Sequence, residues 1–408
     1  MSAPAVRQCA ILVGGLGTRL GPLTTTLPKP LMPCGDRPFL AWLIRELQRF
    51  GIEKFVLLAG HMSEEIESAV EKIRAWLPKP AQISVSVEPF RAGTGGALHH
   101  ARALLDDRFV VCNGDSIFAC NLAQFFAHGL HDRAFHNWIL LRAVDDLDRY
   151  GAVKLAEGSH RVASFQALSK PGEPGLINSG VYLFDHSVFD HITENCSLEQ
   201  SVLPRLAEAG ELGGLTLEGY FRDIGLPDDL AAAEEELPRQ LVRPAVFLDR
   251  DGVINVDHGW VGTKDRFEWA DRIFAALECL TDRGFHVFIV TNQSGIARGH
   301  YTEDDLDALM HWAIDTIRAQ GATIDDWRYC PTHPEALLPQ YRADNMRRKP
   351  GTGMIDELVA AWEIDRTRSF LFGDQLTDIA AGQAAGLRTC LVQEQTLADI
   401  VFNGSAFT

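Results

Sequence analysis

Short apolar runs alternate with longer segments of helical periodicity along this chain of 408 residues. Each apolar run ends abruptly in glycine or polar residues, as buried parallel strands do when they deliver functional groups at their carboxyl ends. Strands that alternate with helices in this way predict an α/β fold with parallel sheets covered by helices on both faces. The runs are Cys9–Gly15, Phe55–Gly60, Phe109–Asp115, Ala245–Gly252, His286–Asn292 and Ser369–Asp374.

Two of these runs, Cys9–Gly15 and Ala245–Gly252, look like the first strands of separate domains. The segment Ala231–Arg243 between them is typical of a helix with an acidic face, which we expect to end at Pro238 before a short connector. The chain length suits two or three domains at roughly 150 residues each. We therefore predict one domain over residues 1–238 and a second over residues 244–408.

Composition narrows the function classes. Apolar residues make up 46% and charged residues 23% of the chain, which suits a folded globular protein, and the net charge of −17 argues against a nucleic-acid partner. The eight cysteines show no CxxC spacing, which favours a reducing compartment over a disulfide scaffold. No apolar run approaches the ~18 residues of a membrane span, so we expect a cytoplasmic protein without a membrane partner. A homo-oligomer is compatible with the sequence, which does not determine the oligomeric state.

The strongest local signal is the loop Gly14–Pro33, which follows the first strand. Its glycines permit positive φ and let backbone N–H groups approach an anion closely. Arg19 and Lys29 add two cations, and the prolines on either side of Lys29 stiffen the chain. A loop of this kind suits a triphosphate, whereas a bare GxG would indicate only a tight turn. The glycines are Gly14, Gly15 and Gly17.

This loop resembles the signature of the sugar-1-phosphate nucleotidyltransferases, and matches continue through most of the expected N-terminal domain. The resemblance implies a Rossmann-like, GT-A-like fold in which Arg19 and Lys29 contact phosphates, and Asp115 and Asp223 bind Mg²⁺. It places Gly93–Ala97 at the nucleobase. The implied nucleotide-binding residues are Gly14, Gly15, Gly17, Thr18, Arg19, Lys29, Gly93, Thr94, Gly95 and Asp115.

On the sugar-phosphate side the resemblance implies Lys170 and Asn178. Many members carry Glu-Lys where this chain has Ser169-Lys170, so the role of that glutamate has no counterpart at this position. The segments Leu147–Leu155 and Leu176–Phe184 look most like the D-glycero-α-D-manno-heptose 1-phosphate guanylyltransferases. Mannose-1-phosphate guanylyltransferases and glucose-1-phosphate thymidylyltransferases are the neighbouring classes.

A second group of candidate site residues begins with Asp249 and Asp251, which follow an apolar strand. Paired carboxylates at a strand end can bind Mg²⁺ and divide nucleophile and acid/base roles, although an Asx turn explains such a pair alone. The order continues with Thr291, then Lys349, then Asp374 and Asp378. This order resembles the haloacid-dehalogenase phosphatases, with their Rossmannoid fold.

The resemblance implies that Asp249 is the nucleophile and that Asp251 is the general acid/base. Thr291 and Lys349 would cradle the phosphoryl group, and Asp374 would complete a Mg²⁺ site with Asp249 and the backbone carbonyl of Asp251, supported by Asp378. The subfamily most similar is D-glycero-D-manno-heptose 1,7-bisphosphate 7-phosphatase, with histidinol-phosphate phosphatases close by. Residues implied to line its substrate are Asp257, His258, Trp260, Thr291, Asn292, Gln293, Ser294, Arg348 and Lys349.

These phosphatases usually carry a zinc loop of the form C-x-H…C-x-C before RKP. Here Cys330 is present, but Thr332 replaces the histidine, and Asn345 and Arg347 replace the last two cysteines. Structural zinc needs four nitrogen or sulfur ligands, so we expect no structural zinc and a loop held by packing and hydrogen bonds.

Together the two resemblances predict a bifunctional, Mg²⁺-dependent enzyme that uses GTP and heptose phosphates. One alternative is a nucleotidyltransferase for mannose or glucose 1-phosphate, or one with an ADP or dTDP product, fused to a different sugar- or histidinol-phosphate phosphatase. An alternative of another class is a regulatory protein that binds sugar nucleotides. The presence of all the implied charged residues speaks against that class, and pyrophosphate release would discriminate the two.

Overall fold

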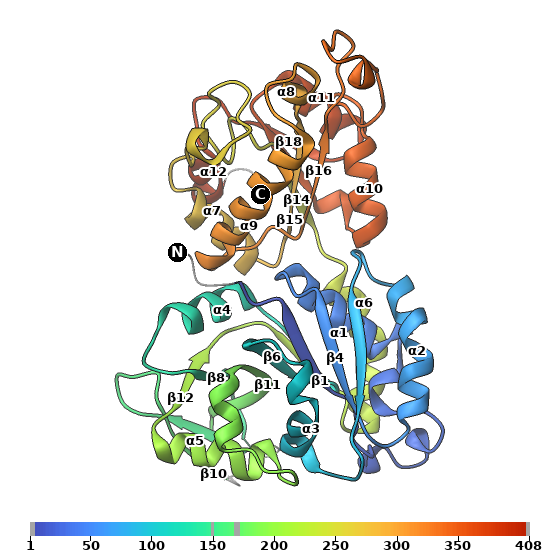
Figure 1. Ribbon diagram of the computed structural model, residues 1–408, viewed down its shortest axis with the longest axis vertical. Coiled ribbons are helices and arrows are strands. Elements are labelled where there is room, and N and C mark those ends of the chain that lie inside the picture. The colour runs from blue at the N-terminus through green and yellow to red at the C-terminus, as the bar shows by residue number, and fades with distance from the viewer. Residues whose placement is uncertain (1–4, 148–150, 167–171, 405–408) are drawn as a thin grey trace. The chain divides into compact units, whose positions relative to one another are not determined.

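The computed structural model describes residues 5–147, 151–166 and 172–404. Its internal contacts divide the chain into two compact units, the first ending at Leu241 and the second starting at Val242. Both units are α/β folds, as the alternation of apolar runs and helical segments predicts (Figure 1).

A nine-stranded sheet forms the centre of the first unit. Strand β1 (Gln8–Leu12) lies between β4 (Lys54–Ala59) and β6 (Arg108–Asn113), and the three strands are parallel. On the other side of β6, β11 (Gly175–Asp185) runs antiparallel. The outer strands of the sheet are β5 (Gln82–Val87), β8 (Asn137–Val144), β9 (Ala152–Leu155), β10 (Val162–Gln166) and β12 (Leu212–Thr216).

Helices cover this sheet because its inner strands are apolar on both faces. Helix α1 (Phe39–Arg49) is buried along its whole length, and α3 (Gly93–Ala101) and α5 (Leu203–Ala209) share a core with β1, β4, β6 and β11. Helices α2 (Ser63–Ala75) and α4 (Leu122–His131) complete the layers, and two-stranded pairs join β7 (Ser116–Ala119) to β13 (Tyr220–Asp223) and β2 (Pro33–Cys34) to β3 (Arg37–Pro38).

Helix α6 (Pro227–Leu241) corrects one expectation, because it continues past Pro238 instead of ending there. Proline removes one backbone hydrogen bond from a helix, and this cost is outweighed here by packing. Leu237 and Leu241 are both buried, and Pro238 lies against Gly35, where an added Cβ would come within 2.6 Å of the Pro238 ring.

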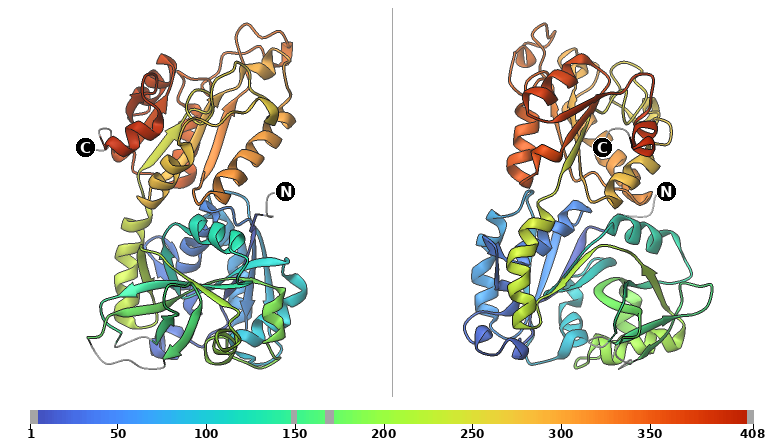
Figure 2. Two further views of the ribbon diagram at one scale, coloured as in Figure 1. Left: turned by 90° about the vertical axis from the view of Figure 1, so that its left-hand side faces the viewer. Right: turned by 180° about the vertical axis from the view of Figure 1, so that it is seen from behind.

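The second unit is built on a parallel sheet of five strands in the order β16-β15-β14-β17-β18. Alternate side chains of the central strands enter two separate cores, as the pleat requires. Val246 and Leu248 of β14 pack with α7, α9 and α12, whereas Phe247 packs with α10 and α11. The ribbon views show helices on both faces of this sheet (Figure 2). The strands are β14 (Ala245–Leu248), β15 (His286–Asn292), β16 (Asp326–Cys330), β17 (Phe370–Gly373) and β18 (Arg388–Leu391). The helices are α7 (Ile273–Asp282), α8 (Ser294–Ala297), α9 (Glu303–Ala319), α10 (Gly353–Trp362), α11 (Leu376–Ala384) and α12 (Leu397–Asn403).

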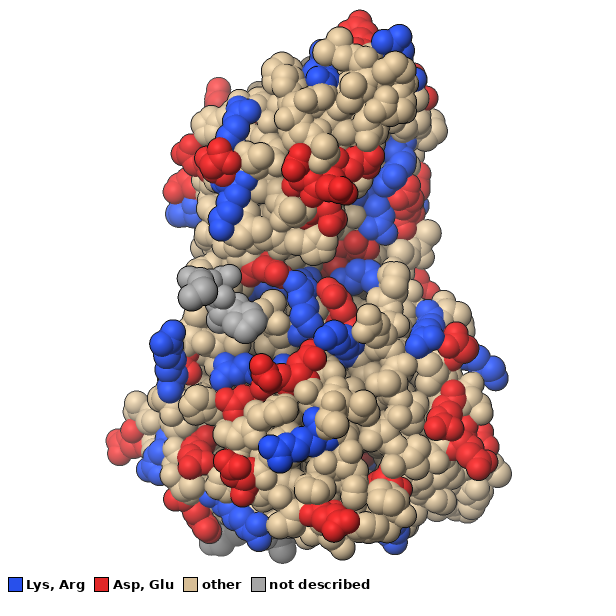
Figure 3. Space-filling view, in the orientation of Figure 1, with Lys and Arg blue, Asp and Glu red and all other residues tan. Residues whose placement is uncertain are grey.

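Charged side chains of both signs lie on the surface. On the face drawn in Figure 3, Lys and Arg side chains are interspersed with Asp and Glu side chains and do not merge into one broad basic area. Within the described ranges, no helix combines the length and the apolar character that crossing a bilayer requires.

Candidate active sites

The glycine-rich loop of the first unit follows β1 and turns through two short 3-10 helices, Thr18–Thr24 and Lys29–Leu31. Gly14 lies so close to the neighbouring strand connection that an added Cβ would be 2.8 Å from the backbone nitrogen of Gly60. Gly17 has a φ of +63°, which L side chains rarely adopt. The sequence therefore needs glycine at both positions to bring this loop over the end of the sheet.

A cavity of about 460 Å³ opens beside this loop, at the carboxyl ends of β1 and β6. It adjoins a second cavity of about 500 Å³ that Gly14 and Gly93 line with Glu88 and Asn195. Such volumes are in the range of small-molecule sites. Polar residues that line the first cavity are Thr18, Arg19, Lys29, Arg91, Thr94, Asn113, Asp115 and Glu199.

Two carboxylates meet in this region because β13 pairs with β7. The register places Asp223 opposite Ser116, which directly follows Asp115 in the chain. Burial raises the pKa of Asp223, and the nearby Asp115 raises it further, while Lys29 and Arg19 act in the opposite direction. Two neighbouring carboxylates suit a divalent cation, and their oxygens are ligands that Mg²⁺ prefers.

Lys29 and Arg19 are the cations beside these carboxylates. The buried Lys29 Nζ lies 2.6 Å from Asp115 Oδ2. The Arg19 guanidinium lies over Gly225, where an added Cβ would come within 3.1 Å of Arg19 Nη2 and 2.5 Å of Asp223 Oδ1. The region around the cavity thus combines the Asp115 and Asp223 carboxylates with cations from one loop, an arrangement that suits a phosphate group with a bound metal ion.

The structure bears differently on the two sugar-phosphate residues that the resemblance implies for the first unit. Lys170 lies outside the described residues. Asn178 is on β11, where its amide donates to the Tyr182 hydroxyl at 2.8 Å and its carbonyl oxygen accepts from the Gly180 N–H. It is absent from the residues that line the two cavities.

Glu199 is a cavity residue that the sequence reasoning missed. Its Oε2 accepts hydrogen bonds from the hydroxyls of Thr94, at 2.8 Å, and Ser197, at 3.0 Å. Glu199 thereby anchors the first turn of α3, the segment expected at the nucleobase. No motif surrounds this glutamate, and the pairing with Thr94 spans 105 residues, so only the tertiary fold brings the two together.

In the second unit, acidic side chains converge at the carboxyl edge of the sheet. One carboxylate oxygen from each of Asp249, Asp374 and Asp378 lies within 4.8 Å of the others. Burial raises the pKa of Asp249 to about 6, although the ion pair with Lys349 lowers it. Three carboxylates in this space fit a Mg²⁺ ion, whose charge would favour the ionised form of Asp249.

Lys349 is the buried cation of this cluster. Its Nζ lies 3.0 Å from Asp249 Oδ2 and 2.6 Å from Asp378 Oδ1, and it donates to the Val290 carbonyl at 2.8 Å. Asn292 holds the Lys349 backbone from both sides, accepting from its N–H at 3.0 Å and donating to its carbonyl at 3.1 Å. Asp378 thus has a direct place in the site, because it shares Lys349 with the expected nucleophile.

Gly252 makes room for the acidic cluster, and its replacement is a first testable prediction. Its φ is +81°, and an added Cβ would collide with the Asp374 carboxylate. We expect Gly252→Ala to lower phosphatase kcat at least ~10²-fold, since small displacements of catalytic groups have effects of that size. Steady-state hydrolysis of 4-nitrophenyl phosphate measures this. Gly284→Ala is the matched control, because Gly284 also has positive φ (+79°) but an added Cβ there meets no atom within 4 Å. Equal losses in both variants would contradict the prediction.

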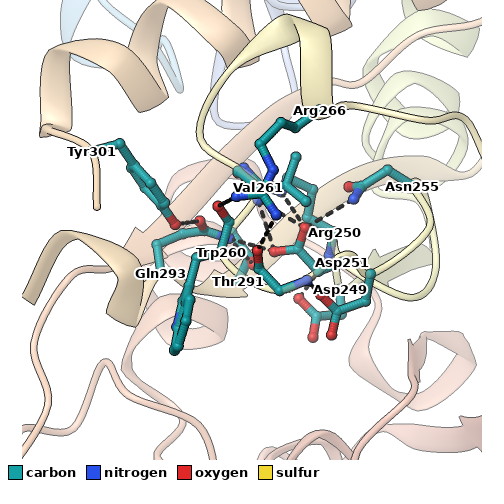
Figure 4. A network of polar contacts seen from close by, with 12 residues as sticks. Asp249, Arg250, Asp251, Asn255, Trp260, Val261, Arg266, Thr291, Gln293 and Tyr301 are labelled. Carbon is teal, nitrogen blue, oxygen red and sulfur yellow. Dashed lines mark hydrogen bonds and ion pairs between the residues drawn. The ribbon is translucent and has the colours of Figure 1, made fainter. Parts of the chain in front are cut away.

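The side chain of Asp251, the expected acid/base, lies in a network of hydrogen-bond donors (Figure 4). Gln293 Nε2 donates to Asp251 Oδ2 at 2.9 Å and to Thr291 Oγ1 at 2.9 Å. The Tyr301 hydroxyl in turn donates to Gln293 Oε1 at 2.6 Å, and burial raises the pKa of Tyr301 to about 12, so this phenol keeps its proton. Gln293 and Thr291 therefore belong to the same network as Asp251, whereas Ser294 begins α8 next to them.

The loop Asp257–Val261 lies next to this network. His258 Nε2 is 2.8 Å from Glu268 Oε2, and the exposed Trp260 stacks on His300 with ring centroids 4.1 Å apart. Trp260 has a φ of +49°, which is uncommon for a bulky residue. Exposed aromatic and polar side chains on one loop next to the carboxylates are suited to contact a sugar.

The loop between β16 and Lys349 is held by side-chain hydrogen bonds. Asn345 Nδ2 donates to Thr332 Oγ1 at 2.8 Å, and Cys330 Sγ lies 3.3 Å from the same hydroxyl. Asn345 Oδ1 accepts from the backbone N–H groups of Arg347 and Arg348 at 2.9 and 3.2 Å. The residues that stand at the expected zinc-ligand positions thus form a polar cluster, except that the Arg347 side chain pairs with Glu357 at 3.0 Å.

From this cluster we predict that the purified chain carries well under one zinc ion per molecule, because a thiol, a hydroxyl and an amide do not replace four nitrogen or sulfur ligands. Elemental analysis of the chain purified without chelator measures this directly. Phosphatase activity after dialysis against a zinc-selective chelator, followed by Mg²⁺ repletion, should equal the activity before dialysis. Stoichiometric zinc, or a loss that only zinc restores, would contradict the prediction.

Comparison with known proteins places both units in families. The nucleotidyl transferase family model matches residues 9–240, and a HAD-hydrolase-like model matches residues 346–398. A D-glycero-beta-D-manno-heptose-1,7-bisphosphate 7-phosphatase of Rhodopseudomonas palustris is 52% identical over 145 residues, which are 36% of this chain and 81% of that protein. A D-glycero-alpha-D-manno-heptose-1,7-bisphosphate 7-phosphatase of Burkholderia mallei is 42% identical over 148 residues, which are 36% of this chain and 78% of that protein.

Among solved structures, HddC from Yersinia pseudotuberculosis complexed with GMP-PN is 30% identical with a TM-score of 0.50, covering 57% of this chain and 99% of that chain. With the phosphatase relatives, this likeness accounts for both units. The chain belongs to the nucleotidyl transferase family through its first unit and to the HAD-type heptose-bisphosphate phosphatases through its second, and it is a bifunctional enzyme.

Proposed function

We propose that this enzyme removes the 7-phosphate of D-glycero-D-manno-heptose 1,7-bisphosphate and then transfers GMP from GTP to the resulting heptose 1-phosphate. The observation that carries this proposal is that one chain joins a heptose-bisphosphate phosphatase unit, 52% identical to a relative of that class, to a nucleotidyl transferase unit. A 7-phosphatase leaves the 1-phosphate in place, and a sugar 1-phosphate is what such a transferase uses. The likeness to a structure complexed with GMP-PN supports GTP as the nucleotide.

In the phosphatase reaction, the Asp249 carboxylate attacks the phosphorus of the 7-phosphate. The bond from phosphorus to the sugar oxygen breaks, and Asp251 gives its proton to that oxygen. Water then attacks the phosphorus of the aspartyl phosphate and gives a proton to Asp251, which releases phosphate and restores Asp249. Lys349 lies 3.0 Å from Asp249 and would neutralise charge on the phosphoryl oxygens.

In the nucleotidyl transfer, an oxygen of heptose 1-phosphate attacks the α-phosphorus of GTP. The bond to the bridging oxygen breaks, and pyrophosphate leaves. Arg19 and Lys29 line the cavity where the triphosphate would lie and would stabilise the charge that develops on pyrophosphate. This step needs positioning and charge neutralisation, which the cavity residues supply, and no covalent intermediate.

Enzymes of both families generally use Mg²⁺. In this chain Asp115 and Asp223 would hold it in the first unit, and Asp249 and Asp374 in the second, with Asp378 beside them. When bound, the ion would neutralise charge on the phosphate oxygens.

Product analysis by mass spectrometry tests the proposal. The enzyme receives the α or the β anomer of the heptose bisphosphate together with ATP, GTP, CTP, UTP and dTTP in equal amounts. We expect free phosphate, pyrophosphate and GDP-heptose from one anomer. A product with another base, or nucleotide transfer only to mannose or glucose 1-phosphate, would overturn the assignment. Tight nucleotide binding without pyrophosphate from any sugar would instead indicate a regulatory protein.

A further inference from the structure

Arg250 stands between the expected nucleophile and the expected acid/base in the sequence, and its side chain is fully buried. Figure 4 shows it beside Asp251. Its Nη2 donates to both oxygens of Asp251, each at 2.8 Å, and its Nε donates to Oδ1 at 3.2 Å. Burying a guanidinium is costly unless it is paired and hydrogen-bonded. The ion pair with Asp251 therefore offsets the cost of burying Arg250. Because the guanidinium is planar and donates through Nε and Nη2, it also fixes the plane of the Asp251 carboxyl group.

Two amides complete the surroundings of the Asp251 carboxyl group. Asn255 Nδ2 donates to Oδ1 at 2.9 Å, and Gln293 Nε2 donates to Oδ2 at 2.9 Å. Both oxygens thus have donors, and the Asp251 side chain keeps 21% exposure, through which it can exchange protons with solvent. Among these partners, Arg250 is the one that contacts both oxygens.

Arg250 also connects Asp251 to the loop Asp257–Val261. The same Nη2 donates to the Val261 carbonyl, at the end of that loop. Arg266 donates to other carbonyls of the loop, those of His258 and Gly259 at 2.9 Å each, and among the described residues it makes no hydrogen bond or ion pair with Asp251. Both arginines therefore hold the loop, but only Arg250 of the two also holds the expected acid/base. Comparing their variants separates the two roles.

We propose that Arg250 is a positioning residue for the phosphatase reaction, which orients the Asp251 carboxyl group for proton transfer to the leaving oxygen and ties it to the sugar-facing loop. This inference rests on the proposed role of Asp251. Arginine cannot itself relay the proton, because its guanidinium stays protonated. Its contribution is to hold Asp251 in position. Loss of this contribution should lower the rate most for substrates whose departing oxygen needs a proton.

The dependence of the rate on the leaving group tests this role. Aryl phosphates from 4-nitrophenyl phosphate to phenyl phosphate have nearly the same shape, but their phenols differ in acidity. The value of kcat/KM reports the step in which the aryl oxygen departs. For Arg250→Met we expect a loss of at least ~10-fold with phenyl phosphate and less than ~3-fold with 4-nitrophenyl phosphate, because general acid catalysis contributes ~10²–10⁴-fold when a proton is needed. The plot of log kcat/KM against phenol pKa should steepen.

Two further variants make the outcome decisive. Asp251→Asn should give the steepest plot, whereas Arg266→Met should leave the wild-type slope. Arg250→Lys, which keeps the charge but not the fork, should fall between wild type and Arg250→Met. If Asp251→Asn steepens the plot and Arg250→Met lowers kcat/KM by the same factor for all substrates, the inference is wrong and Arg250 is only structural. If Asp251→Asn itself leaves the slope unchanged, the proposed acid/base role of Asp251 fails instead.

Discussion

Asp249→Asn should abolish phosphatase activity, by ~10⁴-fold or more, and leave nucleotidyl transfer at the wild-type rate. The amide cannot form the aspartyl phosphate, and no neighbour replaces it, because Asp374 and Asp378 belong to the same small cluster but follow another strand. The fold should survive, since Lys349 retains Asp378 as its counter-ion at 2.6 Å. Phosphate release from the heptose bisphosphate and pyrophosphate release from GTP with heptose 1-phosphate, assayed on the same preparation, measure the two activities.

The matched control for this variant is Asp271→Asn. Asp271 also belongs to the second unit, but its side chain is 73% exposed and pairs with Arg272, so the same chemical change should leave both activities intact. Loss of both activities in Asp249→Asn would show that the two sites are coupled. Residual phosphatase activity above a few per cent of wild type would show that another group is the nucleophile.

Asp115→Asn should give the reverse result, with nucleotidyl transfer reduced ~10³-fold and phosphatase activity unchanged, by analogy with the removal of one group that stabilises transition-state charge. The substitution removes one of two carboxylates suited to a metal ion and leaves Lys29 without its partner at 2.6 Å. Both effects disturb the charge balance at the α-phosphorus. Pyrophosphate release over a range of Mg²⁺ concentrations is the measurement, and the variant should need more Mg²⁺ to reach its maximum rate.

Asp107→Asn is the control for Asp115→Asn, because Asp107 is exposed and precedes β6, whereas Asp115 follows that strand at its other end. An equal loss in the two variants would indicate damage to the strand and not to the site. Unchanged pyrophosphate release in Asp115→Asn would remove this carboxylate from the catalytic machinery and leave Asp223 without its proposed partner.

Local sequence carries the chemistry of both sites because strand ends and glycine-rich loops are short-range features. The positive φ of Gly17 and Gly252 and the place of Asp115 and Asp249 directly after buried strands follow from a few neighbouring residues. The alternation of apolar runs with helical segments likewise predicts the α/β class, which the structure confirms. Pro238 shows the limit of such rules, since burial of Leu237 and Leu241 keeps α6 intact beyond it.

The partners of these residues come from distant parts of the chain, and no local pattern predicts them. Glu199 meets Thr94 across 105 residues, and Lys349 lies between Asp249 and Asp378 only because three strands end at one edge of a sheet. The cluster of Thr332 and Asn345 also depends on how a long loop closes.

By itself, the sequence determined the fold class, the strand-end carboxylates, the glycine-rich loop and the family resemblance, because each depends on residue type and short spacing. The tertiary structure alone decided which groups contact the residues expected to be catalytic. The pairing of Gln293 with Asp251, and of Lys349 with Asp378, depends on burial, where a charge needs a counter-charge and each donor needs an acceptor. That requirement is met in three dimensions, between segments whose separation along the chain has no bearing on their distance in space.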